Sequence, residues 1–126
     1  MALPADAAAV AFVLTRDRAA SEAFYRDTLG LPFIADDGFA AVFDLNGARL
    51  RITHIPDHAA APHPVLGWRV SDIRAAVAGL KARDVEMIVY PGMGQDEAGI
   101  WTAPGGVAHV AFFADPDGNV LSLTQE

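Results

Sequence analysis

The sequence contains no cysteine, so disulfide bonds, thiolate nucleophiles and thiolate metal ligands are excluded. It also lacks an apolar run long enough to cross a membrane. The apolar stretch that starts at Ala7 is short, follows Asp6 and has no basic segment before it, unlike a signal peptide. We interpret this stretch as a first β-strand, and we expect a cytoplasmic protein without a membrane partner.

Basic residues are scarce: nine Lys and Arg stand against sixteen Asp and Glu, which gives a net charge of −7. This balance argues against nucleic acid as a partner; it leaves open a small cationic ligand, or a charge that serves only solubility. The chain has no phosphate loop, no Gly-x-Gly-x-x-Gly after a strand and no Gly-x-Ser-x-Gly elbow. With 126 residues it is long enough for a domain that contains a ligand pocket.

The first half of the chain predicts a strand, a helix and three further strands. Asp17 is a plausible N-cap for a helix that ends near Leu29, where Gly30 supplies the left-handed residue after the last turn. Hairpin turns are indicated at Asp36-Asp37-Gly38 and at Asn46-Gly47. The strands are expected at residues 8–15, 32–35, 39–45 and 49–55.

The second half repeats this order after a proline-containing linker at residues 56–63. Ser71 or Asp72 caps a second helix, whose apolar residues recur at helical spacing. Asp84 stands where the first half has Gly30, and we expect it to accept the left-handed conformation. Strands are expected at residues 65–70, 85–90, 108–114 and 119–125.

Both halves therefore read βαβββ, and Asp17 and Ala20 align with Asp72 and Ala75, as an internal duplication predicts. We expect one α+β domain over residues 1–126, made of modules 1–55 and 64–126. A four-stranded half cannot bury both faces of its sheet alone, so the modules must pair within one chain or across a dimer. We expect a homodimer.

Two segments carry a resemblance to a known family. The sequence FFADPDGNVLSLTQ at residues 112–125 places a tight Asp-Pro-Asp-Gly-Asn turn between two apolar runs, and SEAFYRDTLGLPFI at residues 21–34 ends a helix at Gly30. Together they resemble the vicinal oxygen chelate superfamily of glyoxalases, bleomycin resistance proteins and extradiol dioxygenases. The resemblance covers nearly the whole chain.

The resemblance implies a cupped mixed β-sheet whose concave face holds a divalent metal, bound by His or Glu. In this sequence the corresponding positions are Val10, Arg51, Val65 and Ser122. None of them ligates a divalent ion well, and Arg51 would repel one. We therefore expect no metal and no other cofactor; the alternative is one divalent metal at an unusual site that uses His54, His63 or His109.

The period of two along a strand indicates which side chains line the concave face. Arg51 and Arg69 share this face, where a guanidinium group requires a partner. The partner is either a carboxylate such as Asp44 or Glu97, or an anionic or carbonyl-bearing ligand. The candidate ligand-binding residues are Phe12, Arg49, Arg51, Arg69, Trp101 and Ser122.

The glycine-rich loop at residues 90–106 contains Trp101, which can stack on a flat ligand. We interpret the protein as a metal-independent small-molecule-binding protein similar to the bleomycin-resistance branch, sequestering a drug or metabolite. The alternative is an enzyme of the same superfamily, a lyase, isomerase or dioxygenase with relocated metal ligands. No catalytic residue is assigned, although Asp96 and Glu97 are available as general bases.

Overall fold

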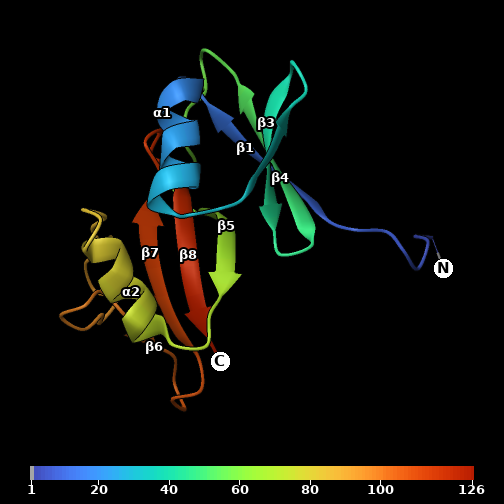
Figure 1. Ribbon diagram of the computed structural model, residues 1–126. Helices are drawn as coiled ribbons and strands as arrows, with labels where there is room; N and C mark the ends of the chain where they lie inside the picture. The colour runs from blue at the N-terminus through green and yellow to red at the C-terminus, as the bar shows by residue number, and fades with distance from the viewer. Residues whose placement is uncertain (1) are drawn as a thin grey trace. The chain divides into compact units, whose positions relative to one another are not determined.

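The computed structural model describes residues 2–126 and divides into two compact units, Met1–His58 (unit 1) and Ala59–Glu126 (unit 2). Each unit contains one mixed four-stranded sheet and one α-helix in the order βαβββ (Figure 1). The predicted α+β fold with two βαβββ modules is confirmed. No helix within residues 2–126 has the length and apolar composition of a membrane span.

Unit 1 has the strand order β1-β4-β3-β2, with β1 parallel to β4 and the other pairs antiparallel. The Asp17 carboxylate accepts a hydrogen bond from the Ala20 amide at 3.2 Å and so caps α1, while Gly30 adopts φ +75° after the helix, as predicted. The elements are β1 (Val10–Thr15), α1 (Arg18–Ala23), its continuation as a π-helical turn η1 (Phe24–Thr28), β2 (Phe33–Asp36), β3 (Ala40–Leu45) and β4 (Ala48–His54).

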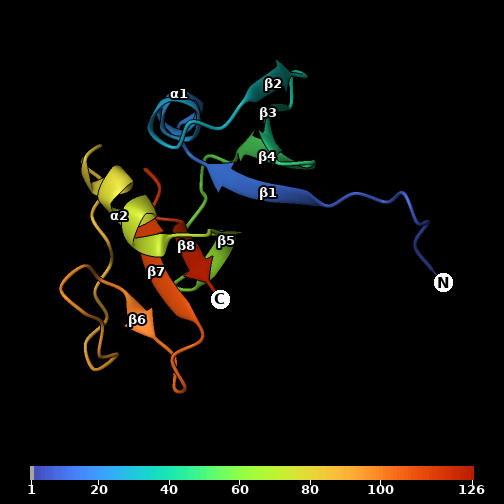
Figure 2. The same ribbon diagram turned by 60° about the horizontal axis from the view of Figure 1, so that its bottom comes forward.

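In unit 1, β4 alternates between a buried face and a more open face, whereas the β3 residues Ala40–Phe43 are all buried and β2 is exposed throughout. α1 packs against β4 (Figure 2). Tyr25, in the continuation η1, is completely buried. The covered sheet face supplies the core, which consists of Val13, Thr15, Ala41, Phe43, Leu50 and Ile52. The residues between them in sequence point away from this core, so the opposite face of the sheet is available for other contacts.

Unit 2 has the order β5-β8-β7-β6, with β5 parallel to β8. Its helix is capped by Asp72 rather than Ser71, because the Asp72 carboxylate accepts from the Ala75 amide at 3.1 Å. Asp84 has φ +64°, as expected for the residue that replaces a glycine. The elements are β5 (Pro64–Arg69), α2 (Ile73–Lys81), β6 (Trp101–Thr102), β7 (His109–Ala114) and β8 (Val120–Gln125), with α2 packed on β7 and β8.

The prediction of a strand at residues 85–90 is wrong, and the third strand of unit 2 is instead the short β6. The Gln95 side chain accounts for the difference. Its Nε2 donates to the carbonyl oxygens of Ile88 (2.8 Å) and Gly99 (3.1 Å), and its Oε1 accepts from the Tyr90 amide (2.7 Å). A side chain thus satisfies backbone groups that a neighbouring strand would otherwise pair with.

The Asp-Pro-Asp-Gly-Asn turn before β8 is held by the carboxylate of Asp115, which is only 5% exposed. This group accepts from the amides of Asp117 (2.9 Å) and Asn119 (3.0 Å) and from Asn119 Nδ2 (2.8 Å). Gly118 closes the turn with φ +84°. The motif therefore fixes where β7 ends and β8 begins.

The capping of α2 gives a first prediction. Replacing Asp72 by Ala removes the acceptor for the Ala75 amide, and we expect a loss of about 1 kcal/mol in the free energy of unfolding. Asp72→Asn keeps an oxygen at the same place and should retain most of this stability. Urea unfolding of the three proteins, followed by circular dichroism, measures the difference; equal losses for Ala and Asn would contradict the capping role.

Candidate functional site

The open face of the unit 1 sheet brings together the three site residues predicted in that half. Phe12 on β1 lies beside Arg51 on β4, and Arg51 lies opposite Val42 on β3. Arg49 lies two residues before Arg51 on β4, on the same face of the sheet, and is paired with Val10 of β1. Phe12 remains 63% exposed, so an aromatic ring and two guanidinium groups share a surface open to solvent.

Arg51 is paired with a carboxylate that the sequence did not indicate. Its Nη2 donates to Oδ2 of Asp37 at 2.5 Å, in the turn between β2 and β3. The expected partners Asp44 and Glu97 are wrong. Asp44 stands directly opposite Arg49 in the β3–β4 register and binds that side chain at 3.2 Å, while Glu97 lies in unit 2 beside α2.

The Asp37 carboxylate is stabilised in its charged form. The hydrogen bond from Arg51 is the main cause, followed by the backbone amides of Phe39 and Ala40, and together they lower its pKa to about 2. Both side chains of the pair are partly open to solvent, 29% for Arg51 and 39% for Asp37. The pair is therefore not a buried structural ion pair. Within residues 2–126 it engages one nitrogen of a guanidinium group that has five N–H donors.

The open face of the unit 2 sheet carries the other three predicted residues. Ser122 on β8 is flanked by Gly67 on β5 and Phe112 on β7. A Cβ at Gly67 would lie 2.2 Å from Ser122 Oγ, so the missing side chain makes room for this hydroxyl. Trp101 and Arg69 belong to the adjacent row, and the Arg69 guanidinium, 77% exposed, reaches only Glu126 at 3.6 Å.

Two aromatic residues of this face were missed by the sequence analysis. Phe112 lies opposite Ser122, and the Tyr90 ring meets the Phe112 ring edge to face, with centroids 5.5 Å apart. The period of two on β7 could have identified Phe112, but nothing local indicates that Tyr90 folds back onto it. Trp68 has the opposite parity and stacks on the buried Phe113, as expected for a residue on the helix side.

The residues at the family's metal positions do not fit a divalent cation. Val10 and Val65 offer no donor atom, Ser122 offers a neutral hydroxyl, and Arg51 brings a positive charge. Across residues 2–126, no three His, Asp or Glu side chains come together in a group that could hold a metal ion.

The three histidines considered for an unusual site are engaged elsewhere or exposed. His109 Nδ1 lies 3.0 Å from Thr102 Oγ1, and His63 Nδ1 lies 3.3 Å from the Pro64 carbonyl oxygen. His54 is exposed at the end of β4. We therefore derive no chemical step through a metal.

The Asp37–Arg51 pair gives a second prediction. In the wild-type protein the pKa of Asp37 should be about 2, below its ordinary value of 3.8. Arg51→Ala should raise it, leaving only the smaller effect of the backbone amides. Because the folded pKa lies below the unfolded value, the pair contributes stability that is present above pH 4 and is lost as the pH falls through about 2.

Carboxyl carbon shifts recorded over a pH series by NMR measure this pKa. Arg49→Ala is the matched control, because it removes the cation beside Asp44 from the same sheet face and leaves Asp37 untouched. A wild-type Asp37 that titrates at its ordinary value would show that the ion pair does not form in solution.

Several solved structures share this fold. A glyoxalase family protein from Bacillus anthracis superposes with a TM-score of 0.76 at 16% identity, covering 100% of this chain and 99% of its own. Lactoylglutathione lyase from Agrobacterium tumefaciens superposes with a TM-score of 0.72 at 20% identity, covering 97% of this chain and 95% of its own. TnmS3, an antibiotic-binding protein from Streptomyces sp. CB03234, superposes with a TM-score of 0.74 at 24% identity, covering 99% of this chain and 98% of its own.

These identities are low, so the likenesses establish the fold alone. A search of the curated proteins found no match. The model of one family matches residues 7–123, nearly the whole chain. The chain belongs to the Glyoxalase/Bleomycin resistance protein/Dioxygenase superfamily.

Proposed function

We propose that this protein binds a small molecule without a metal and sequesters a drug or metabolite, as a binding protein of the glyoxalase/bleomycin-resistance type. One observation carries the proposal: Phe12 stands exposed beside Arg51, on an open sheet face that also holds Arg49. The ligand that suits this surface has a flat apolar body and an anionic or carbonyl group. The aromatic ring contacts the first part and the guanidinium groups bind the second.

The unit 2 face offers the same combination of chemistry. Trp101 and Phe112 supply aromatic surface, Ser122 supplies a hydroxyl, and Arg69 supplies an exposed cation. Glu126 competes only weakly with a ligand for Arg69, because an exposed ion pair at 3.6 Å is weak. We therefore propose that Arg69, Trp101 and Ser122 also contact a ligand, on a surface that unit 2 forms by itself.

The fold likeness to TnmS3, which is described as an antibiotic-binding protein, supports a binding role. Lactoylglutathione lyase and the oxidase ChaP-H2 have the same fold, so an enzyme remains the competing function. A metal-dependent lyase, isomerase or dioxygenase would need donor atoms that Val10, Arg51, Val65 and Ser122 do not provide. The binding role is the better supported of the two, and we assign it to the cytoplasm.

A fluorescence titration tests the proposal with 1-anilinonaphthalene-8-sulfonate, an anion with a flat naphthalene ring, in buffer that contains EDTA. We expect saturable binding that added Zn²⁺, Ni²⁺ or Mn²⁺ does not strengthen. Arg51→Ala should weaken it about tenfold, the loss expected for a charge-assisted hydrogen bond of about 1.5 kcal/mol.

Arg26→Ala is the control, because it removes an equal charge at the end of η1, where Arg26 pairs with Asp27. Binding that is lost with EDTA and restored by one equivalent of a divalent ion would move the protein to the enzyme class. Equal losses in the two variants would reject Arg51 as a ligand contact.

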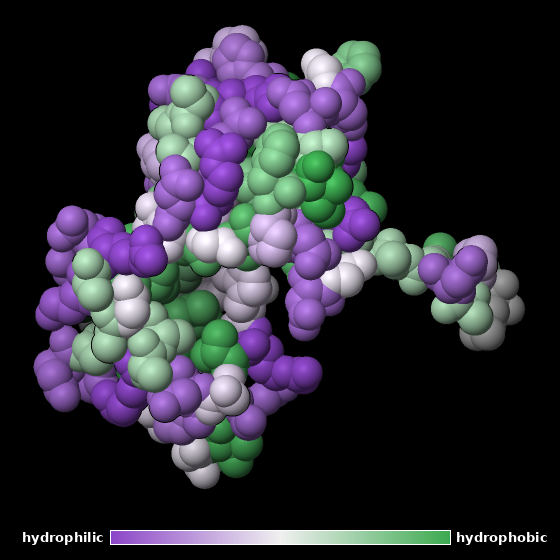
Figure 3. Space-filling model, in the orientation of Figure 1, coloured by the Kyte–Doolittle hydropathy of each residue, from purple (hydrophilic) through white to green (hydrophobic). Residues whose placement is uncertain are grey.

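We also propose a homodimer formed through the edge of the unit 1 sheet. β2 is an edge strand, and all four of its residues are exposed. It carries Phe33 and Ile34, and Phe39 follows in the turn with 81% of its surface exposed. Figure 3 shows hydrophobic surface over the strands of unit 1. An exposed apolar edge strand is an association surface.

Sedimentation velocity at micromolar concentration should therefore give a dimer. Ile34→Lys should convert it to a monomer, because a lysine on an edge strand opposes strand addition. Val107→Lys, on an exposed loop of unit 2, should leave the dimer intact. A monomeric wild-type protein would contradict the proposal, and so would a dimer that survives Ile34→Lys.

A further inference from the structure

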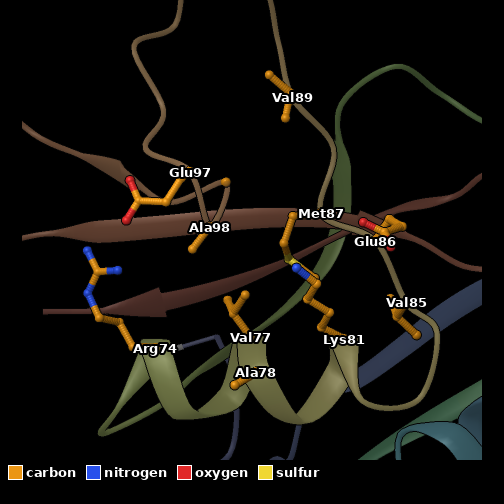
Figure 4. Close-up of a pocket in the computed structure, with 11 residues that line it drawn as sticks. Arg74, Val77, Ala78, Lys81, Val85, Glu86, Met87, Val89, Glu97 and Ala98 are labelled. Carbon is orange, nitrogen blue, oxygen red and sulfur yellow. The ribbon is translucent and has the colours of Figure 1, made fainter.

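A cavity lies in unit 2, beside α2 and apart from the open sheet faces. It has a volume of about 380 Å³ and opens between α2 and the segment at residues 85–99 (Figure 4). This volume falls in the range of small-molecule sites. Its apolar lining consists of Val77, Ala78, Val85, Met87, Val89 and Ala98.

The wall of the cavity opposite α2 is held in place by its own hydrogen bonds. Gln95 ties together the backbone at Ile88, Tyr90 and Gly99. Asp96 accepts from the amides of Ala98 and Ile100, both at 2.9 Å, and binds Arg74 of α2 at 2.7 Å. The cavity is therefore preformed, as ligand sites usually are.

Small residues keep this space open. Ala78 lies on the helix side and Ala98 on the loop side, and neither is large enough to fill it. Gly99 has φ +82°, and a Cβ there would lie 2.6 Å from the Met87 Cβ. The glycine thus lets the loop pack closely on Met87, whose side chain points into the cavity in Figure 4.

The charged residues of the lining favour a cation. Arg74 is neutralised by Asp96. Within residues 2–126, no ion pair engages Lys81, Glu86 or Glu97, although the charge of Glu97 also acts on Arg74. With Asp96 included, three carboxylates in and beside the lining stand against two cations, Arg74 and Lys81. The net charge of −7 on the chain adds to the attraction of positive ligands.

We propose that this cavity, which we call the α2 groove, binds a small amphiphilic amine. The apolar body of the amine lies on Val77, Met87 and Ala98, and its ammonium group approaches the Glu97 carboxylate at the rim. The Arg74 Nη2 donates to Asp96, whereas Glu97 acts on Arg74 through its charge and accepts no hydrogen bond from it, so the Glu97 oxygens are available as acceptors. The proposal does not depend on ligand binding at the sheet faces.

Tryptamine is the probe, with indole-3-propionate as its anionic counterpart. In ¹H–¹³C and ¹H–¹⁵N NMR titrations, tryptamine should shift the Met87 methyl and the Ala98 amide, with a dissociation constant of about 1 mM for a ligand of this size. Indole-3-propionate should bind at least about fivefold more weakly. The Trp101 indole N–H reports separately on the sheet face.

Three variants sharpen the test. Ala78→Leu fills the groove with a good helix former and should weaken tryptamine binding at least about tenfold. Glu97→Gln should weaken it about two- to fivefold, as for an exposed charge pair. Asp57→Asn makes the same charge change at an exposed position in unit 1 and should have no effect.

Shifts confined to Trp101 and Phe112 would overturn the proposal, because they would place tryptamine on the sheet face. Equal or tighter binding of indole-3-propionate would overturn it as well. Equal losses of tryptamine affinity in Glu97→Gln and Asp57→Asn would also overturn the proposal. Glu97→Gln is a surface change, so the test stays decisive even if Ala78→Leu does not fold.

Discussion

Parallel pairing between the first and last strands of each module is the constraint on which the rest of the structure depends. It aligns Phe12 with Arg51 in unit 1 and Gly67 with Ser122 in unit 2. A single helix then covers one face of each sheet, and the opposite face carries the candidate residues, although Ala40, Val42 and Val120 on that face are buried. The candidate binding surfaces follow from this pairing and require no special loop.

Much of this arrangement was accessible from the sequence because it depends on local chemistry. Asp17 and Asp72 cap their helices through a carboxylate three residues from the amide they bind. Gly30 and Asp84 adopt left-handed conformations where the helices end. The alternation of side chains also placed five of the six candidate residues on open sheet faces, since parity needs only the strand positions; Trp101, chosen as a loop residue, lies on the short strand β6.

The two wrong predictions, the strand at residues 85–90 and the partner of Arg51, concern long side chains that bind groups brought near them by the fold. Residues 85–90 have the composition of a strand, but the Gln95 amide bonds their backbone groups, and the sequence gives no sign of this fold-back. Arg51 reaches Asp37 because the β2–β3 turn brings that carboxylate over the sheet, while Asp44 is held by Arg49. Both outcomes depend on tertiary geometry, which residue spacing does not encode.

Arginine has a different chemical role from the metal that the family fold suggests. A divalent ion acts as a Lewis acid that polarises and activates a ligand oxygen bound to it. A guanidinium group holds such an oxygen through hydrogen bonds and is not a Lewis acid of that kind. The presence of Arg51 at such a position therefore favours retention of a ligand over its transformation. The proposed binding is therefore expected to be insensitive to chelators.

The contact between Gly67 and Ser122 has a consequence for the divergence of this sequence. Because Ser122 Oγ occupies the place of a side chain at position 67, and its carbonyl oxygen would lie 3.1 Å from an added Cβ, the two sites cannot vary independently. A relative that gains any side chain at the position of Gly67 must lose or redirect the hydroxyl opposite it. Positions 67 and 122 are therefore expected to covary, and the present direction of the Ser122 hydroxyl depends on the glycine.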